Sequence, residues 1–268
     1  MTRQSFFAGS WYPNNPTDLR ALVTPADSPA KTAGLALLPH AGLYYSGRGI
    51  APFFAELDPS MTNLAIIGPS HYEPIYRDQI TTAFFDSYHT PLAKLSGFEL
   101  PGSSHVHAQI LGREHSVEMT LPFIAALPNP PIIATALIND ITSLKKLEEL
   151  IDVLTQPSLG VIASSDFTHY GWRFGFAGQT PEEVRTRDVH VAYLLAAGEI
   201  EAAFEFFTQD EHTICGWASA LLVANLARRK NFVGEVVSYY TSNEVTNSAD
   251  DEFVAYATIL WRKNEPTL

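Results

Sequence analysis

The sequence is short of three things: cysteine, basic residues and long apolar runs. Its single cysteine, Cys215, cannot form an intramolecular disulfide, and a lone thiol is typical of a reducing compartment, so we expect a cytoplasmic protein. Lysine and arginine total 17 against 29 aspartates and glutamates, which gives a formal net charge of −12. Nucleic acids and anionic membrane surfaces bind clusters of cations, so the sequence predicts neither as a partner.

The apolar runs are all short. No segment approaches the roughly 20 apolar residues of a membrane-spanning helix. Near the start, Gly9 and Ser10 interrupt the apolar run too early for the core of a signal peptide. Hydrophobic residues nevertheless make up 46% of the 268 residues and charged residues only 17%, which is typical of a compact globular protein. Pro25–Pro29 and Asn129–Pro131 are too short to be flexible linkers, so we predict one domain over residues 1–268.

Runs rich in Val, Ile, Leu and Ala predict strands that are buried on both faces of a sheet. These runs are Gly34–Leu38, Asn63–Ile67, Pro131–Ile138, Gly160–Ala163, Glu235–Thr241 and Phe253–Leu260. Helical patterns lie over Ser116–Ala126, Leu144–Leu154, Glu183–Ala197, Ile200–Phe207 and Gly216–Arg229. Interleaved strands and helices indicate an α/β layer architecture. The region from Thr81 to Glu114 fits neither pattern, and we expect hairpins or an active-site loop there.

Three of the predicted strands lead directly into a polar turn that carries histidine. His40 follows Gly34–Leu38, His71 follows Asn63–Ile67, and Asp166 and His169 follow Gly160–Ala163. Ligands bind outside the carboxyl ends of strands in open α/β sheets, so we expect these four side chains on one rim. A single histidine there is more often structural, but the repetition favours a site. Asp166 could orient His169 or cap a local turn. The remaining histidines considered are expected in surface loops: His89, His105, His107 and His190.

Two further features bear on chemistry. His115 and Glu118 are three residues apart at the start of the predicted helix Ser116–Ala126, with Pro122 in its second turn, and would share a helix face. They either face a catalytic pocket or merely complement the helix dipole. Cys215 precedes the helix Gly216–Arg229, a position that lowers the pKa of a thiol and favours a metal ligand or nucleophile. The alternative is a small buried apolar residue.

Six short motifs occur in order along the chain. They are Ala8–Pro13, Pro39–Gly42, Gly68–His71, Glu114–Met119, Ser164–His169 and Thr213–Gly216. Together they resemble the Memo family, which includes the bacterial and archaeal AmmeMemoRadiSam system protein B. The resemblance runs from Phe7 to about Thr258 and implies a single α/β domain. Its mixed or mostly parallel central sheet would be flanked by helices, as in the class III extradiol dioxygenases.

The resemblance also implies a site. His40, His71 and Cys215 match the family's metal-binding positions. The residues that match its pocket positions are Asp166, His169, His115 and Glu118, with His169 where the dioxygenases keep a catalytic histidine. The implied cofactor is one metal ion, Fe(II) or copper, with zinc as a further candidate. Family association implies a radical-SAM protein and a small AMMECR-type protein as partners.

One departure from the dioxygenases is chemical. Those enzymes hold Fe(II) with two histidines and one carboxylate, whereas the third position here is a thiolate, which shifts the preference toward Cu(I) or zinc.

Three hypotheses for the function stay open. The protein is a metal-dependent redox protein in which His169, oriented by Asp166, moves a proton. It is a non-catalytic module that binds a peptide or partner protein. Or Cys215 is a nucleophile with His169 or His40 as base. Whether it is an enzyme, such as a non-haem oxidoreductase, is left open.

Overall fold

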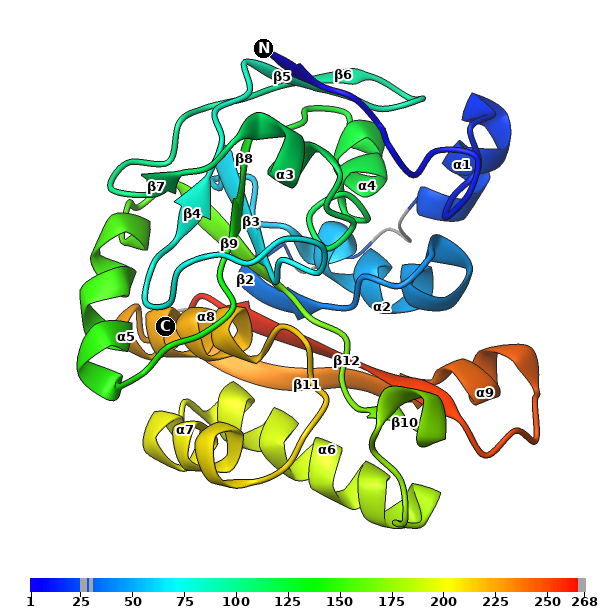
Figure 1. Ribbon diagram of the computed structural model, residues 1–268. Helices are drawn as coiled ribbons and strands as arrows, with labels where there is room; N and C mark the ends of the chain where they lie inside the picture. Colours follow the sequence, from blue (N-terminus) through cyan, green and yellow to red (C-terminus); the bar gives the residue numbers. More distant parts are fainter. Residues whose placement is uncertain (25–27, 29–30, 265–268) are drawn as a thin grey trace.

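The structure is a computed structural model that describes residues 1–24, 28 and 31–264. It has three layers, with a mixed central sheet between two groups of helices (Figure 1). Four neighbouring strands are parallel, in the order β2, β9, β3, β8. Their bounds are Ala33–Leu38 for β2, Leu159–Ser164 for β9, Asn63–Gly68 for β3 and Ile132–Leu137 for β8. The proline-containing stretch Pro25–Pro29 lies almost wholly outside the described residues.

Antiparallel strands extend the sheet on both sides. Next to β2 lies β12 (Phe253–Arg262), which pairs with β11 (Val233–Thr241) and β10 (His169–Tyr170). Beyond β8 lie β4 (Thr81–Thr82) and β7 (Ser104–His105). The six strands predicted from apolar runs are all present, and the predicted α/β class with a mixed sheet flanked by helices is confirmed.

The two faces of the sheet carry separate apolar cores. Leu35 and Leu37 of β2 point into the core that covers one face, whereas Ala36 and Leu38 point into the other, as the alternation of a strand requires. The first face packs against α5 (Leu144–Ile151), α6 (Pro181–Ala197), α7 (Ile200–Gln209) and α8 (Trp217–Arg229). The second packs against α1 (Pro16–Val23), α2 (Leu43–Glu56) and α4 (Leu121–Ala126). The remaining helices are short: α3 (Ala108–Gly112), α9 (Ser242–Thr246), η1 (Asp152–Leu154) and η2 (Trp172–Phe174).

The region from Thr81 to Glu114 contains the expected hairpin. Strands β5 (Ser87–His89) and β6 (Lys94–Ser96) are antiparallel, and β1 (Thr2–Arg3) adds to β5 to form a second, three-stranded sheet. The histidines expected on the surface are exposed: His89, His105, His107 and His190. None of the helices in the described part of the chain combines the length and the apolar character that crossing a membrane requires.

One predicted helix begins at the wrong residue. The pattern predicts a helix over Ser116–Ala126, but α4 begins at Leu121 and residues 116–120 form turns. Pro122 explains the difference, because a proline in the second turn would clash with the carbonyl four residues earlier. In the observed helix Pro122 lies in the first turn, where its missing N–H is not needed. The expectation that His115 and Glu118 share a helix face is therefore wrong.

Candidate metal centre

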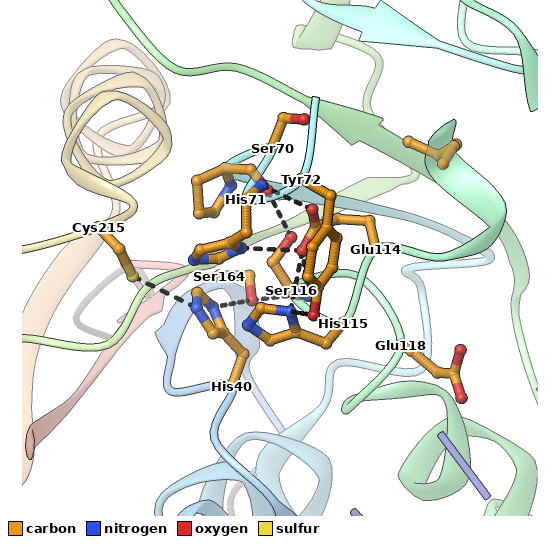
Figure 2. A network of polar contacts seen from close by, with 12 residues as sticks. His40, Ser70, His71, Tyr72, Glu114, His115, Ser116, Glu118, Ser164 and Cys215 are labelled. Atoms are coloured by element: carbon orange, nitrogen blue, oxygen red, sulfur yellow. Dashed lines mark hydrogen bonds and ion pairs between the residues drawn. The ribbon is translucent and has the colours of Figure 1, made fainter. Parts of the chain in front are cut away.

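Three predicted ligands meet at the carboxyl edge of the parallel strands. His40 follows β2, His71 follows β3, and Cys215 lies just before α8. One donor atom from each lies within 4.8 Å of the other two, and the Cys215 Sγ is 3.3 Å from the His40 Nε2. Figure 2 shows the three side chains converging from separate segments of the chain. The sheet topology thus brings together residues that are up to 175 positions apart.

A glycine lets Cys215 reach the edge of the sheet. The Gly216 N–H donates to the Ser165 Oγ at 3.0 Å, which joins the start of α8 to the end of β9. A Cβ atom at position 216 would lie only 2.3 Å from the Ser164 carbonyl oxygen. Only glycine permits this close approach, so the sequence Cys215-Gly216 places the thiol against the sheet.

The ring of His40 is held in one tautomer. Its Nδ1 lies 2.9 Å from the Ser164 Oγ, and that hydroxyl donates its single proton to the Ser116 carbonyl. The His40 Nδ1 must therefore be the donor, which leaves the Nε2 lone pair free and directed at Cys215. Burial and the neighbouring histidines hold the pKa of His40 well below its usual range, so the ring is neutral. A neutral imidazole with a free lone pair is the form that binds metals.

A carboxylate orients His71. The His71 Nδ1 donates to the Glu114 Oε1 at 2.9 Å, and the His71 backbone N–H donates to the Oε2 at 2.7 Å. Burial raises the pKa of Glu114, but the hydrogen bonds from His71 and Ser116 outweigh it and hold this pKa below its ordinary value. Asn139, after β8, fixes the same loop through Ser70, whose N–H donates to the Asn139 Oδ1 at 2.6 Å. A carboxylate behind a metal-binding histidine is a common arrangement.

Cys215 differs from the expectation in one respect. Burial, and then the charge of Asp166, raises the pKa of this thiol, so the helix-start argument for a lowered pKa is wrong. The protonated thiol beside the weakly basic His40 is a poor nucleophile on its own.

Asp166 has a different role from the predicted one. Its Oδ1 accepts from the His40 backbone N–H at 2.7 Å, and among the described residues no hydrogen bond joins it to His169. Burial raises the pKa of Asp166 to about 7. Asp166 thus fixes the turn that carries His40, and the expectation that it orients His169 is wrong because its carboxylate points to the backbone of the neighbouring loop.

The distances suit a small metal ion with nitrogen and sulfur ligands. With metal–nitrogen and metal–sulfur bonds of about 2.1 and 2.3 Å, the two donor atoms lie about 3.1 Å apart at a right angle and about 3.6 Å apart at the tetrahedral angle. The observed 3.3 Å between the His40 Nε2 and the Cys215 Sγ falls between these values. The donor set therefore fits a metal ion after small side-chain shifts.

A cavity of about 860 Å³ opens beside these ligands. His40, His71, His115, Asp166 and His169 all line it, together with aromatic residues and α9. The Nε2 of His169 is buried and has no hydrogen-bond partner within the described ranges. Burial, followed by the charges of His71 and Arg173, lowers the pKa of His169 to about 4, so this ring is neutral. Thr213, and not Asp166, is the residue that holds His169. The Thr213 Oγ1 accepts a hydrogen bond from the His169 N–H and donates one to the His169 carbonyl, both at 2.9 Å.

His115 lines the cavity, and its ring packs between His71 and Trp11. Its ring centroid lies 4.2 Å from that of His71 and 4.6 Å from that of Trp11. The His115 Nδ1 lies 3.0 Å from the Tyr72 hydroxyl, and burial lowers the pKa of His115 to about 4. Donor atoms of His71, Glu114 and His115 also lie within 4.8 Å of one another, but the Glu114 oxygens already accept hydrogen bonds from His71 and Ser116. We therefore read this second group as support for His71.

Known proteins match nearly the whole chain. A family model described as Memo-like protein covers residues 3–260. The chain belongs to the Memo family. Its relatives include a MEMO1 family protein of Archaeoglobus fulgidus, 28% identical over 95% of this chain and 97% of the relative. Protein MEMO1 of Danio rerio is 30% identical and that of Homo sapiens 27%, each over 95% of both chains. The Memo family is related to the extradiol dioxygenase fold, in agreement with the predicted fold class.

Glu118 does not belong to the pocket of this Memo protein. Figure 2 shows its carboxylate pointing away from the histidines, and the cavity lining within the described part of the chain does not include it. Its oxygens accept from the fully buried Arg3 at 2.7 Å and from the Tyr12 hydroxyl at 2.7 Å. The prediction of a catalytic Glu118 is wrong, because the turns of residues 116–120 send His115 and Glu118 to opposite sides.

Sequence reasoning missed the groups that orient the two histidines. Glu114 stands next to His115 in the Memo motif, and a carboxylate beside a histidine was the available signal. Ser164 ends a buried strand, and a hydroxyl there must find a partner, which was the only hint of its bond to His40. Neither partner could be paired with its histidine before the topology was known.

Proposed function

We propose that this Memo-family protein binds one redox-active metal ion, iron or copper, through His40, His71 and Cys215. The observation that carries the proposal is the convergence of two imidazoles and one thiol within 4.8 Å at the carboxyl edge of the sheet. Both imidazoles have their Nδ1 engaged by Ser164 and Glu114, which leaves each Nε2 available. A thiolate favours Cu(I) or zinc, and two histidines accept iron as well. When bound, the ion would supply electron transfer or activation of a small ligand.

We propose that the cavity beside the ligands holds the substrate and that His169 accepts or returns a proton there. The support is the unpartnered Nε2 of His169, which is buried, neutral and on the cavity wall. Thr213 fixes the backbone of His169 without help from Asp166. A neutral imidazole within reach of a bound molecule is suited to general acid–base chemistry.

The metal content of purified protein tests the proposal. Protein prepared without oxygen should contain close to one equivalent of iron or copper, and Cys215→Ala should lose most of it. His190→Ala, at an exposed histidine outside the cavity, is the matched control and should keep the metal. Equal trace amounts of metal in the wild type and in Cys215→Ala would refute the proposal.

A second candidate function is a binding module that uses the same cavity for a peptide or partner protein. Tyr44 favours it, because this side chain lines the cavity and yet is 67% exposed. By family association, the candidate partners are a radical-SAM protein and a small AMMECR-type protein. Metal-free protein that captures either partner in a one-to-one complex, with Tyr44→Ala weakening the capture, would support this alternative.

A further inference from the structure

Two of the first twelve residues, Ser10 and Trp11, form part of the cavity wall. Trp11 lines it and packs on His115, with 4.6 Å between the ring centroids. The Trp11 carbonyl also accepts from the Leu43 N–H at 2.9 Å, at the start of α2 and just after the turn that carries His40. The position of this segment therefore bears on both His115 and His40.

Glu118 collects hydrogen bonds from four points of this segment. Its Oε1 accepts from the Phe7 N–H at 2.8 Å and from the Tyr12 hydroxyl at 2.7 Å. Its Oε2 accepts from the Arg3 Nη1 at 2.7 Å and from the Phe6 N–H at 3.1 Å. The side chains of Arg3 and Glu118 are both fully buried. A buried carboxylate with this many donors on one segment is an anchor, because breaking one bond leaves an uncompensated buried group.

Arg3 also contacts the segment that supports the candidate metal ligand His71. Its Nη2 donates to the Glu114 carbonyl at 3.0 Å and its Nε to the Leu111 carbonyl at 3.3 Å. Glu114 is the residue whose carboxylate orients His71. The first twelve residues are also held by β1, by the Leu43 hydrogen bond to Trp11, and by Phe7 and Tyr12, which are buried in the second core. Glu118 is the group that ties Arg3, Phe6, Phe7 and Tyr12 to one point.

We propose that Glu118 is a positioning residue: by anchoring the first twelve residues it holds Trp11 against His115 and so sets the wall of the cavity. This anchoring requires no metal ion, so loss of the anchoring and loss of metal binding would be separate results.

The test is the rate at which diethyl pyrocarbonate modifies His115, followed by peptide mass spectrometry of the intact chain. Glu118→Gln removes the charge that pairs with Arg3 and should raise the rate at least about ten-fold, since it removes a charge-assisted bond that opposes local opening. Tyr12→Phe removes one donor and should raise it less. Trp11→Ala uncovers His115 directly. In the double variant Trp11→Ala/Glu118→Gln the rate should equal that of Trp11→Ala, because Glu118 acts through Trp11.

Two controls separate positioning from general loosening. Glu56→Gln weakens a different ion pair, which is only partly buried, to Arg262 at 2.6 Å, and should leave the rate at His115 unchanged. His212, packed on Phe207, reports on the rest of the fold and should keep its rate in every variant. An unchanged rate at His115 in both Tyr12→Phe and Glu118→Gln would overturn the proposal. So would equal increases at His115 and His212, or additive effects in the double variant. If Glu118→Gln does not fold, the test uses Tyr12→Phe and Trp11→Ala. Both should raise the rate at His115, and an unchanged rate in Tyr12→Phe would then overturn the proposal.

Discussion

Glu114→Gln should weaken metal binding without removing a ligand. The Glu114 carboxylate accepts from the His71 Nδ1 at 2.9 Å, the His71 N–H at 2.7 Å and the Ser116 N–H at 3.0 Å. Glutamine keeps one acceptor oxygen and replaces the other by a donor, so at least one of these bonds is lost. Changing a group behind a metal ligand typically costs about 10–100-fold in affinity. We therefore expect the affinity to fall by about 1.4–2.7 kcal/mol in free energy.

The assay is an anaerobic titration of Cu(I) in competition with a chromophoric chelator. The matched control is Glu99→Gln, since Glu99 lies 3.2 Å from the His105 Nε2 on an exposed surface and forms the same kind of pair outside the site. Glu99→Gln should bind Cu(I) like the wild type. If Glu114→Gln also binds like the wild type while Cys215→Ala does not bind, the carboxylate does not support His71 and the reasoning is refuted.

Three further predictions follow from particular contacts. Ser164→Ala removes the acceptor for the His40 Nδ1–H and should lower the affinity for Cu(I) about ten-fold in the same titration. Burial raises the pKa of Asp188 to about 6, so the folded chain holds more protons than the unfolded chain between pH 4 and 6. Asp188 should therefore contribute a loss of about 3 kcal/mol of stability as pH rises through that window, and in urea unfolding the pH dependence of wild type and Asp188→Asn should differ by that amount. Gly216→Ala places a Cβ 2.3 Å from a carbonyl oxygen and should cost about 1–3 kcal/mol, whereas Gly112→Ala, with nothing within 4 Å, should leave the melting temperature unchanged.

Much of the fold and part of the site follow from local sequence patterns. Runs such as Asn63–Ile67 are long enough to be strands and too apolar to be exposed, so the parallel centre of the sheet was predictable. Because parallel strands end at one edge, His40 and His71 could be expected together. Cys215 could be included only through the family motif, since nothing in its own spacing points to β9.

The remaining features depend on tertiary contacts that leave no local pattern. Glu118 and His115 are three residues apart, but Pro122 delays the helix and turns them to opposite sides. The partner of Glu118 is Arg3, 115 residues away, and no rule of spacing connects them. The pKa of Cys215 is likewise set by burial, which outweighs the nearby helix start.

X-ray absorption spectroscopy of anaerobically reconstituted protein tests the central claim most directly, because it identifies the atoms that surround the metal. One sulfur and two imidazole nitrogens should surround each iron or copper ion, and the sulfur should vanish in Cys215→Ala. A metal ion surrounded by oxygen alone, or a sulfur signal that persists in Cys215→Ala, would contradict the assignment of His40, His71 and Cys215 as the ligands.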